Sequence, residues 1–500
     1  MKIYFASQSF YPHIGGVSTH LLNLMTNLQK MGHDVVEVHF RPPGESDEAE
    51  VEGLEVHRVP KQPLNKELLE GYNKFKEHFQ KAIMGGENDI GKEVMEMEGY
   101  AEFEEINKAF GEEMASLLEN HPAEVVHVHD FQLIFLYKYI PRGTPLVFSF
   151  HGEFTDATPP GVKRFLIKNM NEYDKVVFAC KEYADAAVRA GLQKNRVTSI
   201  HPITNTNMFM PMKVDKERVK ELYGIPAYSS MIFCVQRPDW RSSHMQLVRS
   251  MPRVLEKVPE AVLVFAGEKS MSSRLSKERD VYVDRIHDEI RKLGLEDNVF
   301  WLGNIEYRKL PKIYNVSDVV AVLSKSEAFG LSITEAMSCG KPIIGTKVGG
   351  IMVQVRDGFN GYMVDVDDTN TTADRITRLL TDRKLARRMG LNSIKRVRGR
   401  FRTRLGIEKH IGLYKRLITK KTGGWRPERL EMDSINAIIT DYDRTFTDEG
   451  ASTPNSVVKR LKSTKKDLIL STGRKLSLIH ISEPTRPLYI SYAVFCLKKK

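Results

Sequence analysis

The sequence contains no apolar run of the roughly 18 residues that a membrane-spanning helix requires. Cysteine is scarce as well: Cys180, Cys234 and Cys339 in the body of the chain show no Cys-x-x-Cys spacing, which excludes a disulfide framework. The N-terminal MKIYFASQSF is too short and too polar in its second half for a signal peptide, so we expect a cytoplasmic protein. Internal repeats and nucleic-acid-binding motifs are absent, so we expect no nucleic-acid partner.

Charge is distributed unevenly along the 500 residues, whose net charge is +11. Between Gly44 and Asn120 there are 20 acidic and 8 basic residues, and we predict that this stretch forms solvated helices inserted in an N-terminal domain. Arg and Lys dominate from Thr372 to Arg429. This basic stretch is either the exposed face of C-terminal helices or a surface for an anionic acceptor or membrane.

Strand-like and helix-like segments alternate almost throughout, which is typical of a doubly wound α/β fold. A chain of this length exceeds what one core organises. We predict two Rossmann-like domains, 1–207 and 208–400, that face each other across a cleft, followed by a helix and linker at 401–433. In such sheets ligands bind at the carboxyl ends of the strands.

Several polar residues and glycines follow predicted strands. Gly15 and Gly16 open the first helix, where they are either structural or allow the backbone to approach a ligand phosphate or sugar. His151 ends the strand in FSFHGEF, as a hydrogen-bonded loop residue or as a catalyst. In VHVHD, only His127 and His129 share a strand face, so we predict no metal site there.

Two glutamates flank the start of a helix in SKSEAFGLSITEAMSCG. Glu327 follows the apolar strand DVVAVLS, whereas Glu335 lies within a segment of helical spacing. Gly330 allows a tight turn before the helix, and Gly340 is a plausible helix stop.

The helix start predicts a site for a ligand that is both anionic and hydroxylated. Backbone N–H groups of Phe329, Gly330 and Leu331 point out of the helix N-terminus, where the dipole favours an anion. The two glutamates repel an anion, but their carboxylates accept readily from hydroxyls. Arg237, after the first strand of the second domain, can hold a diphosphate bidentately. This combination describes a nucleotide sugar.

On these motifs, the chain from Met1 to about Leu417 resembles a retaining glycosyltransferase of family 4, which has the GT-B fold. The resemblance implies that Glu327, in an E-x7-E motif with Glu335, contacts the donor hexose, that Glu335 contacts the nucleotide ribose, and that the amides between them bind sugar and phosphate. The Gly15–Gly16 pair and His151 match the family as well. It implies a UDP-, GDP- or ADP-hexose donor, a sugar, sugar-phosphate or lipid acceptor, and a transferase without a metal.

The sequence departs from the family pattern at several positions. The usual Gly-Arg is Gln236–Arg237, and the lysine expected five residues after the arginine is Ser242, with Arg241 as a candidate substitute. Thr204–Thr206 and Met352–Val353 replace the customary Gly-Val-Asp and Pro-Glu. The alternatives to a transferase are therefore an inactive protein that binds nucleotide sugars and a GT-B epimerase.

The segment 434–475 resembles the start of a phosphatase domain of the haloacid dehalogenase type. In DYDRTF, Asp441 is expected as the nucleophile and Asp443 as the general acid and base, with Mg²⁺ as cofactor. Thr445 lies in the same motif, and Thr472 in STGR is the expected hydroxyl of the second motif. The pairing with a transferase is typical of sucrose-phosphate or trehalose-phosphate synthesis.

The last residues do not resemble natural protein sequence. LSLIHISEPTR, from Leu476 to Arg486, resembles a translated sequencing adapter, and we interpret 476–500 as a non-native tail. The later lysine and acidic motifs of the phosphatase are missing, so we predict no phosphatase activity for this chain.

Overall fold

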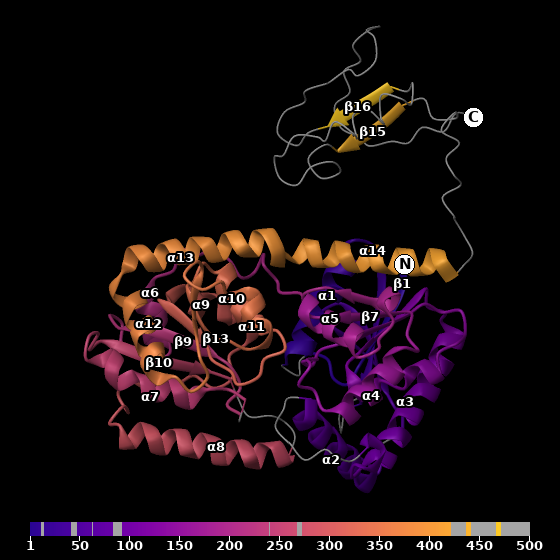
Figure 1. Cartoon of the computed structure of the whole chain (residues 1–500), viewed down its shortest axis with the longest axis horizontal. Helices are drawn as coiled ribbons and strands as arrows, with labels where there is room; N and C mark the ends of the chain where they lie inside the picture. The colour runs from indigo at the N-terminus through magenta and orange to yellow at the C-terminus, as the bar shows by residue number, and fades with distance from the viewer. Residues whose placement is uncertain are drawn as a thin grey trace. The chain divides into compact units, whose positions relative to one another are not determined.

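A computed structural model describes residues 1–11, 15–41, 48–62, 64–83, 93–239, 241–267, 273–421, 437–441 and 467–471. The chain divides into two compact units, Met1–Ile418 and Thr419–Lys500. The first unit contains two parallel sheets with helices on both faces (Figure 1). No helix in the described part of the chain is long and apolar enough to cross a bilayer.

The N-terminal sheet has eight strands in the order β3-β4-β2-β1-β5-β6-β7-β8, all parallel except β3, which runs antiparallel to β4. Its strands are β1 (Lys2–Ser7), β2 (Asp34–Phe40), β3 (Glu48–Val51), β4 (Leu54–Val59), β5 (Val125–His129), β6 (Leu146–Phe150), β7 (Lys175–Phe178) and β8 (Val197–Ser199). Its helices are α1 (Gly16–Lys30), α2 (Lys66–Ile83), α3 (Tyr100–Asn120), α4 (Pro160–Met170) and α5 (Lys181–Arg189). β1 and β5 are parallel, but successive strands are added on one side of β1 up to β4 and on the other side from β5 onward. Such sheets bind ligands at the point where this order reverses.

The C-terminal sheet is wholly parallel, in the order β11-β10-β9-β12-β13-β14. Its strands are β9 (Ser230–Val235), β10 (Ala261–Ala266), β11 (Val299–Trp301), β12 (Val319–Val322), β13 (Ile343–Thr346) and β14 (Gly361–Val364). The helices of this part are α6 (Lys216–Leu222), α7 (His244–Leu255), α8 (Ser273–Lys292), α9 (Leu310–Val316), α10 (Leu331–Ser338), α11 (Gly349–Gln354), α12 (Thr369–Thr381) and α13 (Arg383–Arg396). Here the order reverses between β9 and β12, whose carboxyl ends lead to Arg237 and Glu327. The predicted architecture of two doubly wound sheets is confirmed.

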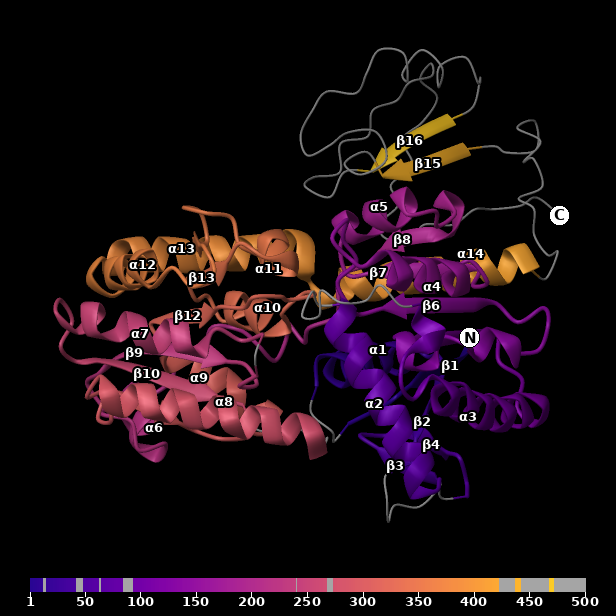
Figure 2. The same ribbon diagram turned by 60° about the horizontal axis from the view of Figure 1, so that its bottom comes forward.

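The last helix of the first unit returns to the N-terminal sheet. A π-helical turn, Val397–Phe401, joins α13 to α14 (Thr403–Lys421), and the two helices run nearly end to end in both views (Figures 1 and 2). Ile407, Leu413 and Tyr414 of α14 are buried in the same cluster as β1 and α1. The helix predicted after residue 400 therefore stabilises the N-terminal half, because its apolar stripe is buried there.

The acidic stretch 44–120 differs from the prediction of solvated helices. It begins with the β3–β4 hairpin, and only then come α2 and α3. The two helices bury aromatic rings between them, with the ring centroids of Phe75 and Phe103 4.4 Å apart. Phe79 and Phe110 are fully buried too. Apart from the buried Glu77, the glutamates of these helices lie at exposed or partly exposed positions, opposite an apolar face that packs into the core.

In the second unit, strands β15 (Ala437–Asp441) and β16 (Asp467–Ser471) pair in parallel, with Asp441 opposite Ser471. Asp441, the expected nucleophile, is the last residue of β15. Asp443, Thr445 and Thr472, as well as residues 476–500, lie outside the described residues. The phosphatase start and the adapter-derived tail therefore stay predictions.

Candidate active site

The loop between β12 and α10 has the geometry that the sequence predicts. Gly330 has a φ of 81°, which few other residues adopt without strain, and α10 begins at the next residue. The helix ends at Ser338, and Gly340 follows with a φ of 75°. Both glycine predictions are confirmed, and the loop presents the first turn of α10 beside Glu327.

Gly349 and Gly350, the first residues of α11, pack against the main chain of this loop. The Gly350 N–H donates to the carbonyl of Glu327 at 2.8 Å, and a Cβ at Gly350 would overlap the Cα of Phe329. Gln354 of α11 donates to the carbonyls of Phe329 and Gly330. The main chain of the loop is therefore held by backbone-to-backbone packing that only glycine allows.

The Glu327 carboxylate is half-buried and lies in a strongly charged neighbourhood. Burial raises its pKa, Arg241 opposes that shift, and Glu153 adds to it. The Phe329 N–H donates to the carboxylate. Glu327 therefore lies directly in front of the helix N-terminus, as the sequence predicts, although its contact with a donor hexose stays a prediction.

Glu335 lies in a more enclosed position, only 4% exposed. Its Oε2 accepts a hydrogen bond from the Tyr314 hydroxyl at 2.9 Å, and Tyr307 donates to the same carboxylate. Burial raises the pKa of Glu335 to about 7 against the opposing effect of these phenols. The predicted ribose contact would have to compete with the two tyrosines.

The two arginines after β9 differ in their partners. Arg237 is exposed and makes no hydrogen bond or ion pair with the described residues. Arg241 instead pairs with Asp239, at 2.6 Å between Nη2 and Oδ2. Ser242, which replaces the expected lysine, is buried, and its hydroxyl bonds to Asp239 and His244. The missing positive charge is therefore present nearby on Arg241, but it is already paired.

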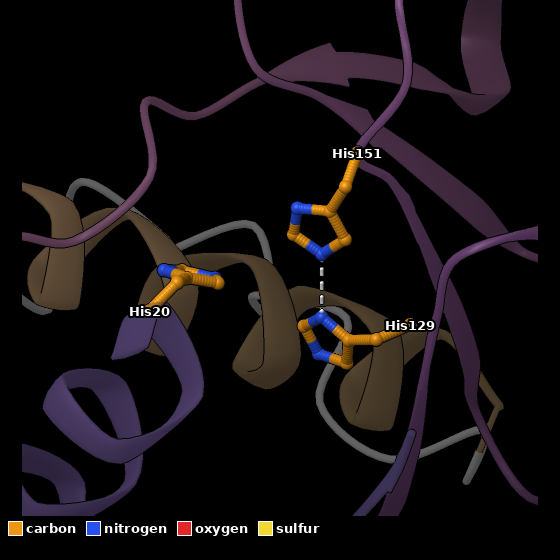
Figure 3. A group of neighbouring side chains, drawn as sticks. All are labelled: His20, His129 and His151. Atoms are coloured by element: carbon orange, nitrogen blue, oxygen red, sulfur yellow. Dashed lines mark hydrogen bonds between the residues drawn. The ribbon is translucent and has the colours of Figure 1, made fainter. Parts of the chain in front are cut away.

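His151 lies in a group of buried imidazoles rather than against Glu327. Its Nε2 is 2.9 Å from Nδ1 of His129, and His20 of α1 completes a triangle whose ring nitrogens lie within 4.8 Å of one another (Figure 3). The rings of His127 and His129 are tilted by 41° with centroids 4.1 Å apart, which confirms that the two share a face. Burial, with the neighbouring imidazoles, lowers the pKa of His151 to about 4, so these rings are neutral at pH 7.

This triangle does not fit a metal ion. Nδ1 of His20 accepts the N–H of Ile203 at 2.8 Å, so its remaining proton lies on Nε2, the nitrogen that a metal would need. His129 Nδ1 and His151 Nε2 share one hydrogen bond. Neutral histidines that coordinate a metal normally donate their other nitrogen to an acceptor, which is the opposite of the arrangement at His20.

The remaining residues predicted on the N-terminal side lie at the same sheet edge. Gly15 precedes α1, and a Cβ at Gly16 would meet no described atom within 4 Å. Asp130 has a φ of 70°, and its carboxylate accepts the Phe131 N–H at 3.0 Å. Asp130 turns the chain at the end of β5 and caps the short helix that follows, and this structural role accounts for an aspartate at the position.

Glu153 is a residue of this site that sequence reasoning missed. It lies two residues after His151, and its Oε1 accepts the hydroxyl hydrogen of Ser326 at 2.8 Å. The contact joins the N-terminal sheet to the Glu327 loop. HGEF contains this glutamate, but nothing in the local spacing marks it, because its partner lies 173 residues away in the chain.

Comparisons with known families account for both halves of the first unit. Residues 15–202 match the family of glycosyl transferase 4-like domains, and residues 215–396 match the glycosyl transferases group 1. The chain therefore contains a glycosyl transferase 4-like domain and a group 1 glycosyl transferase domain. Glu327, Glu335, Arg237 and Arg241 all lie in the group 1 domain, whereas Glu153 and His151 lie in the other.

Individual proteins show the same similarity. The trehalose synthase of Thermococcus litoralis is 27% identical over 361 residues, covering 69% of this chain and 81% of that protein. Among solved structures, Anabaena HepE in complex with UDP-glucose has a TM-score of 0.63 at 18% identity, covering 83% of this chain and all of that chain. A trehalose-phosphate synthase (UDP-forming) of Burkholderia xenovorans in complex with glucose-6-phosphate has a TM-score of 0.66 at 13% identity, with 83% and 100% coverage. These structures establish the GT-B fold.

Proposed function

We propose that this chain transfers a hexose from a UDP-, GDP- or ADP-activated donor to a sugar or sugar phosphate, with retention of anomeric configuration. The observation that carries the proposal is the placement of Glu327 in front of the α10 N-terminus, near Arg237, which has no hydrogen bond or ion pair to any residue that the structure describes. A carboxylate accepts sugar hydroxyls, and the arginine and the helix amides accept a diphosphate. A nucleotide sugar carries both a diphosphate and sugar hydroxyls.

Departure of the nucleoside diphosphate is the step that these groups assist. Arg237 and the N–H groups of Gly330 and Leu331 stabilise the negative charge that forms on the leaving diphosphate. The positive charge of Arg241 lies nearby but is largely offset by its ion pair with Asp239. We therefore propose that the transferase uses no metal for this step.

The acceptor is proposed from the relatives. The Burkholderia protein binds glucose-6-phosphate, and HepE binds UDP-glucose. A UDP-hexose and a hexose phosphate are thus the first pair to test, and a lipid acceptor is the second. Contact of the exposed arginines of α13 and α14 with an anionic membrane surface, and a cytoplasmic location, stay predictions.

A matrix of donors and acceptors tests the function. UDP-, GDP- and ADP-glucose are each incubated with glucose, glucose-6-phosphate, fructose-6-phosphate and a short-chain lipid glycoside, with EDTA present. We expect nucleoside diphosphate release only when an acceptor is present, and NMR shows whether the new anomeric bond keeps the donor configuration. Binding without turnover would instead identify a pseudoenzyme, and interconversion of donors without acceptor would identify an epimerase.

We also propose that the natural protein continues into a complete, Mg²⁺-dependent phosphatase, whereas this chain has no phosphatase activity. A phosphoaspartyl mechanism needs further acidic residues and a cation beyond Asp441 and Asp443. Sugar phosphates with Mg²⁺ should release no phosphate above the level of an Asp441→Asn variant. Release that disappears in this variant would contradict both the missing motifs and the interpretation of the tail.

A further inference from the structure

Glu153 contacts the Glu327 loop through two groups at once. Its Oε1 accepts the Ser326 hydroxyl at 2.8 Å, and its carboxylate also accepts the Glu327 N–H. Glu153 follows β6 of the N-terminal sheet, whereas the loop follows β12 of the C-terminal sheet. One side chain of the N-terminal domain therefore holds both the main chain and a side chain of the loop in the other domain.

The carbonyl oxygen of Glu327 also accepts a hydrogen bond from the N-terminal domain. The hydroxyl of Tyr183, a buried residue of α5 in the N-terminal domain, donates to this oxygen at 3.4 Å, beside the Gly350 N–H at 2.8 Å. Both polar atoms of the Glu327 main chain thus have a partner in the N-terminal domain. A rotation of this peptide would break bonds on both sides, so the direction of the Glu327 side chain depends on these contacts.

Gly349 is the point where these groups converge. A Cβ at this position would overlap the Glu327 carbonyl oxygen and would lie 2.6 Å from the Tyr183 hydroxyl and 3.0 Å from Glu153 Oε1. Gly349 also has a φ of 39°, which favours glycine. The close approach of the two domains at Glu327 therefore requires the absence of a side chain here.

The charges around Glu153 distinguish it from a solvated surface acid. Burial raises its pKa, and the hydrogen bonds from Ser326 and Glu327, together with Arg241, oppose that shift. Arg241 in turn acts on both Glu153 and Glu327. A partly buried carboxylate in this position is costly unless its hydrogen bonds are made, and among the described residues its bonds are to the Glu327 loop.

We propose that Glu153 is a positioning residue of the transfer reaction, which fixes the main chain of Glu327 and thereby couples the approach of the two domains to the placement of the Glu327 carboxylate. The inference rests on the proposed function for its kinetic consequence and deepens it. Glu153 acts through Glu327 and exchanges no proton with the substrate. Loss of its hydrogen bonds should therefore matter more than loss of its charge.

Three variants separate positioning from catalysis. Glu153→Ala removes both bonds and should lower kcat about 100-fold, the usual cost of a misplaced reacting group. The Kd of the nucleoside diphosphate should stay within about 2-fold, because Arg237, Gly330 and Leu331, which are expected to hold the diphosphate, lie in the other domain. In Glu153→Gln the amide oxygen still accepts from Ser326 or Glu327, so this variant should recover most of the lost rate. Ser326→Ala removes one bond and should fall between the two.

The opposite pattern would overturn the proposal. If Glu153→Gln is as slow as Glu153→Ala, the carboxylate itself takes part in the chemistry. If Glu153→Ala keeps the wild-type kcat, the contact has no part in the reaction. Glu182→Ala, which removes an exposed carboxylate of the same domain, is the matched control and should change nothing.

Amide hydrogen exchange gives a test that needs no turnover. The Glu327 N–H donates to Glu153, so its exchange should accelerate at least about 10-fold in Glu153→Ala and less in Glu153→Gln. Unchanged exchange in Glu153→Ala would refute the contact. If the wild type transfers no hexose but the exchange responds as expected, the proposed function fails while the positioning contact holds.

Discussion

At the carboxyl edge of the C-terminal sheet the candidate site consists of charged side chains, whereas at the same edge of the N-terminal sheet it consists of buried imidazoles. Arg237, Arg241 and Glu327 form the first group. His129 and His151 belong to the second, and burial lowers the pKa of both. The charged edge suits a diphosphate and sugar hydroxyls, and the neutral edge can lie next to an acceptor hydroxyl without competing for the diphosphate.

The comparison also shows where the two edges meet. Glu153 is the carboxylate on the N-terminal side that reaches the charged edge, and it does so by bonding to the loop of Glu327. Asn23 of α1 makes a second connection, since its Nδ2 donates to the Tyr307 hydroxyl at 3.2 Å. Variants that remove a charge from the C-terminal edge should therefore differ in their effects from conditions that protonate the imidazoles of the N-terminal edge.

The largest effect is expected from Glu327→Gln, which removes the charge but keeps the shape. Transfer should fall about 10³-fold, because the sugar hydroxyls lose a charged acceptor in the transition state. Nucleoside diphosphate affinity, measured by calorimetry, should remain largely intact. Glu335→Ala should show the reverse, with weaker nucleotide binding and a smaller change in the bound-state rate. Equal losses of nucleotide affinity in both variants would contradict this division of roles.

The next effect concerns the two arginines. Arg237→Ala should cost about 2–4 kcal/mol of transition-state stabilisation and little folding stability, because Arg237 has no partner in the described structure. Arg241→Ala removes the guanidinium from the buried Asp239, whereas the N–H groups of residues 241 and 242 still donate to Oδ1, so it should lower the free energy of unfolding by about 1–3 kcal/mol. Steady-state kinetics and urea unfolding of both variants measure the two quantities. A stability loss that is larger for Arg237→Ala would contradict the assignment.

The sequence predicts the charged edge better than the contacts that position it. Gly330, Gly340 and the E-x7-E spacing are local signals, and the structure places them as expected. Glu153 and Ser326 lie far apart in sequence, so no periodicity or spacing joins them. The pairing of Arg241 with Asp239 is likewise a matter of side-chain packing.

In the acidic stretch 44–120, the helices were predicted but the burial of one face of each helix was not. Its charge density indicates exposure, but charge on the outer face of a helix says nothing about the inner face. The aromatic rings of α2 and α3 repeat at helical spacing, and this pattern was the signal to follow. The short strands β3 and β14 are too brief for their alternation to stand out against the neighbouring loops.

A smaller effect is expected when acid reaches the neutral edge. His410 of α14 lies in the same imidazole group, and burial lowers its pKa to about 4, so the unfolded chain binds a proton between pH 6.5 and 4 that the folded chain excludes. Its contribution to stability is therefore fully present above pH 6.5 and is lost as the pH falls through this window. In His410→Gln the decline of the unfolding free energy over this range should be shallower. His121→Gln, at an exposed position, is the control; identical slopes in both variants and the wild type would contradict the prediction.

The smallest effect is expected at the hydrogen bond between Asn23 and Tyr307, which joins the two edges. Tyr307→Phe removes a phenol that donates to Glu335 and accepts from Asn23. The hydrogen bond from Tyr307 opposes the rise of the Glu335 pKa, so without it this pKa should move above its present value of about 7. A group whose folded pKa is raised stabilises the protein below its unfolded pKa, and this contribution is lost as the pH rises through the folded pKa. Since the unfolded value is 4.5, the loss in the variant should extend to a higher pH than in the wild type.

Thermal unfolding between pH 5 and 8, with Tyr223→Phe as the control for a phenol outside the site, measures the shift. A pH dependence that is unchanged by Tyr307→Phe would show that the Tyr307 hydroxyl has no influence on the protonation of Glu335.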